Sequence, residues 1–371
     1  MMHGWATDAG RRGPPSVPVR RHTDVVGRVR AWLRTPRGRL ARRAAGYAAV
    51  LGAVVLVIWL SPGLVERLDH GNPGWLVAAG ALEVGSCLGF ILLFRAAFRD
   101  RASNLDNALT VEIASAELGA SAILPSAGVA GVALGAWALR RAGKSTEWIA
   151  ERSVAFLILQ NGAFVLGTAV VGAVLLVGPL PGHAPVDLVL LPFVTALLLV
   201  AIVLVAAALG GWHLAEGDAG AAHGRVGRFV RLFELGSRDA LLLLRRPSAV
   251  LGASAYAVLD FAALWATFHA FPDAPSLSVL MLGYLLGQGA SALPLPGGIG
   301  AVESGMIGTL VILDVSPVTA SAGVLAYRAI ALGIPAVWGG IAYVALRRSL
   351  AKQGLPLSEG AATKAVGSPY R

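Results

Sequence analysis

Long, uninterrupted apolar runs constrain this chain more than any other feature. A helix rises 1.5 Å per residue, so it needs about 20 residues to cross the roughly 30 Å hydrocarbon core of a bilayer. Only 14% of the residues are charged and the mean hydropathy is +0.68, whereas a soluble domain carries about 25% charged residues. We therefore predict a polytopic, all-α integral membrane protein with six full spans. The predicted spans are residues 44–60, 74–94, 153–177, 187–210, 248–270 and 318–346.

Two further apolar stretches are interrupted. Residues 111–139 are broken at Leu124-Pro125-Ser126, and residues 277–313 at Leu293-Pro294-Leu295-Pro296-Gly297-Gly298-Ile299-Gly300. Each half has about 13 to 16 residues, which is too short to span at 1.5 Å per residue. Proline removes a backbone donor and glycine allows irregular dihedral angles, so both stretches are typical of broken helices or re-entrant hairpins. Ordinary kinks inside full-length spans are the alternative.

The positions of the basic residues predict the orientation. With six crossings and the N-terminus inside, 29 of the 31 Lys and Arg residues lie on the cytoplasmic side, and the exceptions are Arg67 and Arg328. This agrees with the positive-inside rule and places the protein in the cell (inner) membrane with both termini cytoplasmic. Residues 111–139 then enter from the cytoplasmic face and residues 277–313 from the opposite face. Opposed broken elements indicate an inverted repeat with a substrate site near the midplane.

The remaining segments are basic and lie outside the spans. Residues 1–43 form an arginine-rich cytoplasmic tail, which either lies on anionic lipid or acts only as an orientation signal. The membrane domain covers residues 44–348, and residues 349–371 form a cytoplasmic C-terminal tail. Within the domain, residues 225–246 are typical of an amphipathic interfacial helix, with a solvated basic loop as the alternative. The net charge of +10 is thus explained by cytoplasmic segments, and we expect no nucleic-acid partner.

Ionisable residues inside the membrane are the candidate functional residues, because each costs about 2.5–3.5 kcal/mol to insert. Glu112 lies near a hairpin mouth, where hydration explains it. Glu83 and Asp260 lie within spans, and for both a hydrogen-bonded structural carboxyl and a working group remain open. The full set is Glu83, Glu112, Glu117, Asp260, Glu303 and Arg328.

Glu303 and Arg328 form the sharpest candidate pair. Arg328 is the only basic residue inside a predicted span, and its guanidinium keeps its charge, so it needs a carboxylate or a bound anion. Glu303 follows the Pro-Gly break and lies where a half-helix begins. A phosphate is the functional alternative, because the planar guanidinium bonds two oxygens at once and free amides at a helix start add positive dipole. A purely structural ion pair remains open.

Signatures of catalysis are missing from the sequence. The seven histidines show no metal-ligand spacing, and Cys87 is the only cysteine, so we expect no metal and no cofactor. No nucleotide loop, G-x-S-x-G element or D-x-D metal motif is present. We therefore expect a protein that is not an enzyme.

Three elements resemble a known family. Leu293-Pro294-Leu295-Pro296-Gly297-Gly298-Ile299-Gly300-Ala301-Val302-Glu303 and Ala326-Tyr327-Arg328 are similar to the P-G-G-x-G-x-x-E and Y-R elements of the flippase-like lysylphosphatidylglycerol synthase transmembrane domain. Leu124-Pro125 with Arg140 and Arg141 resembles its first-half hairpin, although residues 126–138 here carry no charge. The resemblance covers about residues 44–348.

The resemblance implies translocation of a phospholipid or polyprenyl-type lipid between leaflets. We expect the headgroup to lie between the hairpins, with its phosphate on Arg328, Glu303 orienting it, and the backbone around Pro296, Gly297, Gly298 and Gly300 approaching it. Asp260 and Glu117 are expected to contact a cationic headgroup or to carry coupling protons.

The expected partners are membrane lipids and, since no aminoacyl-transferase domain follows the last span, a separate lipid-modifying enzyme. The rival functions are a membrane-embedded glycosyl- or phosphotransferase acting on polyprenyl phosphate and a non-catalytic envelope assembly factor.

Overall fold

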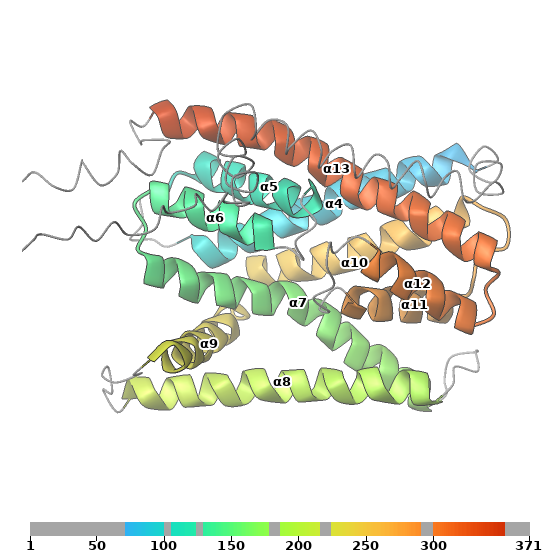
Figure 1. The fold of residues 1–371 in the computed structure, drawn as a ribbon, viewed down its shortest axis with the longest axis horizontal. Helices are drawn as coiled ribbons and strands as arrows, with labels where there is room; N and C mark the ends of the chain where they lie inside the picture. Colours follow the sequence, from blue (N-terminus) through green and yellow to red (C-terminus); the bar gives the residue numbers. More distant parts are fainter. Residues whose placement is uncertain are drawn as a thin grey trace, which may run out of the picture. The chain divides into compact units, whose positions relative to one another are not determined.

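The computed structural model describes residues 71–99, 105–123, 129–177, 186–215, 224–290 and 300–352, all within one compact unit that begins at Gly63. These residues are all-helical and form ten helices (Figure 1). The helices are α4 (Pro73–Phe98), α5 (Asn107–Ile123), α6 (Val129–Arg141), α7 (Thr146–Val177), α8 (Val186–Ala215), α9 (Gly224–Leu243), α10 (Pro247–His269), α11 (Leu277–Ala290), α12 (Ala301–Ile312) and α13 (Pro317–Lys352).

Five of these helices are long and apolar enough to cross a membrane: α4, α7, α8, α10 and α13. They coincide with five of the six predicted spans. The predicted span 44–60, both tails and the breaks at 124–128 and 291–299 lie outside the described residues. The apolar helices α11 and α12 are too short to span, as the interrupted hydropathy of 277–313 predicted.

Sequence signals explain where the long helices begin. Proline occupies the first position of α4, α10 and α13, where its missing N–H would have no helical partner in any case. The Asn72 side chain also caps α4 by accepting a 2.9 Å hydrogen bond from the Gly74 amide. These signals therefore define the first residue of three of the five long helices.

α4 and α10 form the most extensively packed pair of helices, and glycine sets how closely they approach. A Cβ atom on Gly89 of α4 would lie 2.6 Å from the Tyr256 backbone nitrogen, and one on Gly252 of α10 would lie 2.5 Å from the Leu93 nitrogen. In lipid, helix association depends on this kind of close packing between small residues. The crossing brings the acidic residues of the two helices, Glu83 and Asp260, into one neighbourhood.

The short helices form two antiparallel pairs. Gly283 and Gly287 of α11 face Leu310 and Met306 of α12, respectively, so the two helices run in opposite directions. In the other pair, Gly131 and Gly135 of α6 face α5 in the same antiparallel manner (Figure 1). The chain thus contains the same order of elements twice, long–short–short–long, in α4–α7 and in α10–α13.

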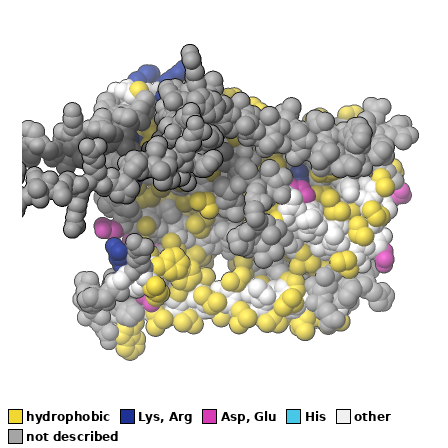
Figure 2. Space-filling model, in the orientation of Figure 1, with side chains coloured by type: hydrophobic (Ala, Val, Ile, Leu, Met, Phe, Trp, Pro, Cys, Tyr) yellow, Lys and Arg dark blue, Asp and Glu magenta, His cyan; other side chains and the backbone are white. Residues whose placement is uncertain are grey.

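α8 lies at the edge of the helix bundle, where it packs against α7 and α9 (Figure 1). Its side chains are largely exposed and apolar, and Figure 2 shows hydrophobic groups, separated by white atoms, along much of the lower edge where α8 lies. The helix predicted over 225–246 is confirmed as α9. α9 packs against α7, where Gly236 lies against Val154 and Asp239 pairs with Arg152 at 3.5 Å. Phe229 and Val230 of α9 remain exposed, so its predicted location in the membrane interface stays a prediction.

Candidate functional site

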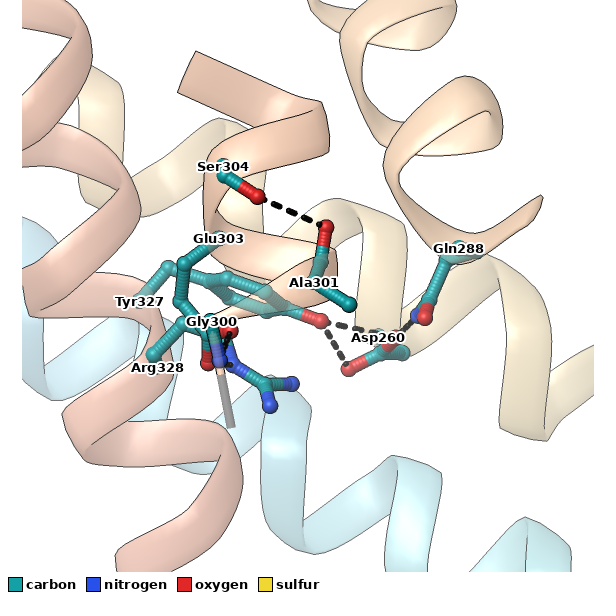
Figure 3. Close-up of polar contacts among 8 residues, drawn as sticks. All are labelled: Asp260, Gln288, Gly300, Ala301, Glu303, Ser304, Tyr327 and Arg328. Atoms are coloured by element: carbon teal, nitrogen blue, oxygen red, sulfur yellow. Dashed lines mark hydrogen bonds and ion pairs between the residues drawn. The ribbon is translucent and has the colours of Figure 1, made fainter. Parts of the chain in front are cut away.

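The predicted ion pair between Glu303 and Arg328 is present. Arg328 Nε of α13 donates to Glu303 Oε1 of α12 at 2.6 Å, and the two side chains are only 19% and 16% exposed, respectively (Figure 3). The pair joins the first turn of α12 to the middle of α13, so it fixes the short helix against the long one.

Glu303 also shapes the start of α12. Its second carboxylate oxygen, Oε2, accepts a 2.9 Å hydrogen bond from the Gly300 amide, so Glu303 caps the first turn of its own helix. Gly300 has φ = 98°, a left-handed conformation that favours glycine over other residues. One carboxylate therefore holds both the helix start and the guanidinium. Pro296, Gly297 and Gly298, predicted to approach the lipid, lie outside the described residues.

The guanidinium of Arg328 has donors left over. Glu303 occupies Nε, and the two terminal nitrogens point away from that carboxylate (Figure 3). Within the described residues they make no hydrogen bond. A guanidinium with two adjacent free nitrogens in a protected place matches two oxygens of a phosphate or carboxylate. Chemically, the arrangement can bind an anion without breaking the ion pair.

Asp260 is the centre of a second, neighbouring polar cluster. Its carboxylate accepts hydrogen bonds from Tyr327 at 2.8 and 2.9 Å, from Tyr284 at 2.5 Å and from Gln288 at 3.2 Å. Asp260, Tyr284 and Tyr327 are all buried. Because Tyr327 precedes Arg328 on α13, the two clusters are joined through adjacent residues of one helix (Figure 3).

Glu83 of α4 extends this cluster. Its carboxyl lies toward Asp260 across the α4–α10 crossing, where a Cβ on Gly85 would lie 2.8 Å from Leu259 Cδ1, and the Cys87 thiol contacts Glu83 Oε1 at 3.8 Å. Glu83 is only 4% exposed, and its Oε2 receives no hydrogen bond from the described groups. Two buried carboxyls, one from α4 and one from α10, therefore lie next to each other in the interior.

The other two carboxyl candidates lie elsewhere. Glu117 is buried between α5 and α6, where a Cβ on Gly135 would lie 1.9 Å from its Oε2, and no described hydrogen bond or ion pair joins it to Asp260, Glu303 or Arg328. Glu112 accepts a 2.9 Å hydrogen bond from the Ser349 hydroxyl, although hydration was expected to explain it. The sequence predicted the same role for Glu117 and Asp260, and the structure places Glu117 in the α5–α6 pair rather than in the Asp260 cluster.

Sequence reasoning missed the donors around Asp260. Tyr284 and Gln288 were not candidates, although they are among the few polar side chains in the apolar run 277–290. Since a buried carboxylate needs donors, a tyrosine and a glutamine four residues apart on one helix face were the available signal.

Fold and site together define a multi-pass helical membrane protein that holds a half-buried ion pair beside a buried carboxyl cluster. The family model of the lysylphosphatidylglycerol synthase TM region matches residues 43–339, and the chain belongs to this flippase-like family. No curated protein sequence matches the chain.

Proposed function

We propose that this protein translocates anionic lipid headgroups between the leaflets of the cell membrane. The observation that carries the proposal is the Arg328 guanidinium, held by Glu303 through Nε with both terminal nitrogens free of described partners. A headgroup phosphate would bind these nitrogens while the acyl chains stay in the bilayer. The protein's membership of the flippase-like family supports the same reading.

The start of α12 adds to the affinity for an anion. The N-terminus of a helix carries partial positive charge, and Glu303 compensates only part of it because it also pairs with Arg328. A phosphate on Arg328 would therefore meet a second source of positive potential within the same turn. Membrane lipids, in particular phospholipids or polyprenyl-type lipids with a phosphate, are the proposed partners.

The proposed path runs between two opposed re-entrant hairpins, α5–α6 and α11–α12. The repeated long–short–short–long order of helices supports two related hairpins. The basic residues Arg140, Arg141 and Lys144 at the α6–α7 connection support entry of α5–α6 from the cytoplasmic side. In this arrangement both termini are cytoplasmic, and α9 lies in the cytoplasmic interface.

Thiol labelling tests the opposed hairpins. Cys87 is buried and is the only cysteine, so a single introduced cysteine supplies the reactive thiol. Each variant is treated with a membrane-impermeant maleimide in intact cells, which expose the outer face, and in inverted vesicles, which expose the cytoplasmic face. We expect Ala127→Cys to react only in the inverted vesicles and Leu295→Cys only in the intact cells. Labelling of both positions from one side would contradict the opposed geometry.

Reconstitution tests the function itself. Purified protein in liposomes is expected to accelerate leaflet exchange of tail-labelled phosphatidylglycerol, measured by dithionite quenching of the outer leaflet. A matched neutral glycosyl-diacylglycerol carries a sugar in place of the phosphate, so the protein should not accelerate its exchange beyond the spontaneous rate. Equal, protein-independent exchange of phosphatidylglycerol would contradict a translocase, and a divalent-metal-dependent product would instead support a transferase.

A further inference from the structure

We propose that Glu83 and Asp260 form a proton-binding carboxyl pair, which binds one proton together with each anionic headgroup bound at Arg328. The inference rests on the proposed function, because the anion it invokes is the lipid phosphate at that site. It adds the energy source, which is a pH gradient across the membrane.

The first support is the geometry of the pair. Glu83 and Asp260 come from different helices, are 4% and 7% exposed, and lie at hydrogen-bonding position to each other. If both were ionised, neither could donate, and two negative charges would repel each other in an apolar interior. Glu83 Oε2, which lacks a described donor, is then left buried and unsatisfied. A single proton on Glu83 converts the contact into a hydrogen bond to Asp260.

The second support is the unequal surroundings of the two carboxyls. Asp260 accepts hydrogen bonds from Tyr284, Tyr327 and Gln288, which stabilise its ionised form. Among the described groups, Glu83 has only the weak Cys87 thiol as a donor. Asp260 is therefore the fixed carboxylate, and Glu83 is the carboxyl that binds and releases the proton.

The remaining titratable groups around the Glu83–Asp260 pair are either neutral or already paired with other residues. On α10, Tyr256 interacts electrostatically with both carboxyls and is itself hydrogen-bonded to Gln160 of α7. On α12, Glu303 is occupied by Arg328 and the Gly300 amide. The Arg328 guanidinium is thus the one cation among the described groups that acts on the pair.

Arg328 links the proton to the anion. It follows Tyr327, which donates to Asp260, so its positive charge lies beside the pair and attracts ionised carboxylates. A phosphate bound at the terminal nitrogens cancels that charge, so the pair then holds its proton more strongly. By thermodynamic reciprocity, a proton on Glu83 strengthens binding of the phosphate by the same factor. One headgroup charge and one proton move together, and the transported unit is electrically neutral.

A metal cation fits this site less well than a proton. Cations need several oxygens with free lone pairs, whereas the Asp260 oxygens already accept three hydrogen bonds from side chains. Within the described residues, no group of three acidic, histidine or cysteine side chains could hold a metal ion.

The experiment uses the full-length protein in liposomes containing tail-labelled phosphatidylglycerol, with the membrane potential clamped to zero. For one proton per lipid, a pH gradient of one unit should enrich the lipid about tenfold in the leaflet facing the alkaline side. Glu83→Gln should lose this enrichment. Glu112→Gln, a carboxyl that bonds Ser349 outside the site, should keep it.

Equal leaflet distribution in the wild type with and without the gradient would overturn the inference while leaving translocation intact. Enrichment driven by a sodium gradient at equal pH, or full enrichment in Glu83→Gln, would also overturn it.

A second measurement separates the inference from the proposed function. In detergent, dimethyl phosphate serves as the anion, because it mimics the phosphodiester and carries no carbonyl. Its addition near neutral pH should increase the infrared C=O band of protonated carboxyls in the wild type and not in Glu83→Gln. If no lipid moves in liposomes but this band grows, translocation is wrong and the proton linkage stands. If neither occurs, both are wrong.

Discussion

Arg328→Gln is expected to lower the initial rate of phosphatidylglycerol exchange in liposomes by at least about 100-fold. Glutamine keeps a polar side chain of similar reach but loses the charge and the paired terminal nitrogens. Each hydrogen bond to a charged group contributes about 1.5–3 kcal/mol, so losing two costs about 3 kcal/mol or more, and 1.4 kcal/mol is tenfold. The rate is measured by dithionite quenching and normalised to the protein incorporated.

The matched control lies on the same helix. Arg347 is an exposed arginine at the other end of α13, so Arg347→Gln removes the same charge without touching the ion pair and should exchange lipid at the wild-type rate. A similar loss in both variants would mean that net charge rather than the site is responsible.

Stability measurements separate a binding role from a structural one. Glu303→Gln alone leaves the half-buried guanidinium without a counter-charge, while the glutamine amide oxygen can still cap α12, so we expect the free energy of unfolding to fall by about 1.5–3 kcal/mol. The double variant Glu303→Gln/Arg328→Gln removes both charges and should recover much of that loss in thermal unfolding. It should nevertheless remain inactive in exchange. A double variant that regains both stability and exchange would show that the pair is only structural.

The same double variant addresses the assembly-factor alternative. A protein that only organises envelope enzymes needs its fold and surface, and would keep full activity in cells once stability is recovered. A translocase needs the guanidinium and would not. Cells that depend on the protein for growth or lipid asymmetry therefore distinguish the two functions.

The sequence predicted the long helices well because one physical quantity decides them. An apolar run of about 20 residues must be helical in lipid, and the predicted span 74–94 corresponds to Pro73–Phe98 in the structure. The pairing of Glu303 with Arg328 was predictable for a similar reason, since a guanidinium inside a membrane span must meet an anion. In both cases a polar group left unpaired in lipid costs much free energy, and only one or two structures can pair it.

The contact between Glu83 and Asp260 could not be predicted in this way. It depends on where α4 and α10 cross, and in a bilayer hydropathy does not set the crossing, because lipid is as apolar as the helix faces. The crossing is decided by Gly89 and Gly252, which are two among 46 glycines in the sequence. The position of Glu117 has the same kind of origin, because it depends on how Gly131 and Gly135 let α6 pack against α5.

Close packing at glycine also decides the contact between α5 and α13. A Cβ on Gly339 would lie 2.3 Å from the Gly119 Cα and 2.7 Å from the Ser115 carbonyl oxygen. Both of these are backbone atoms, so no side chain can rotate to make room. The first hairpin is therefore held against the helix that carries Arg328 by direct backbone contact.

Gly339→Leu is accordingly expected to lower the free energy of unfolding by about 3 kcal/mol or more, because the two helices must separate to admit the side chain. The adjacent Gly340 is the control: a Cβ there meets nothing within 4 Å, so Gly340→Leu should leave the melting temperature close to that of the wild type. Thermal unfolding in detergent, followed by circular dichroism, compares the two. Equal melting temperatures of the two variants would contradict this helix contact. Lipid exchange gives a second test, because α13 also positions Arg328. A Gly339→Leu protein that exchanges lipid at the wild-type rate would show that transport does not require the α5–α6 pair to pack against α13.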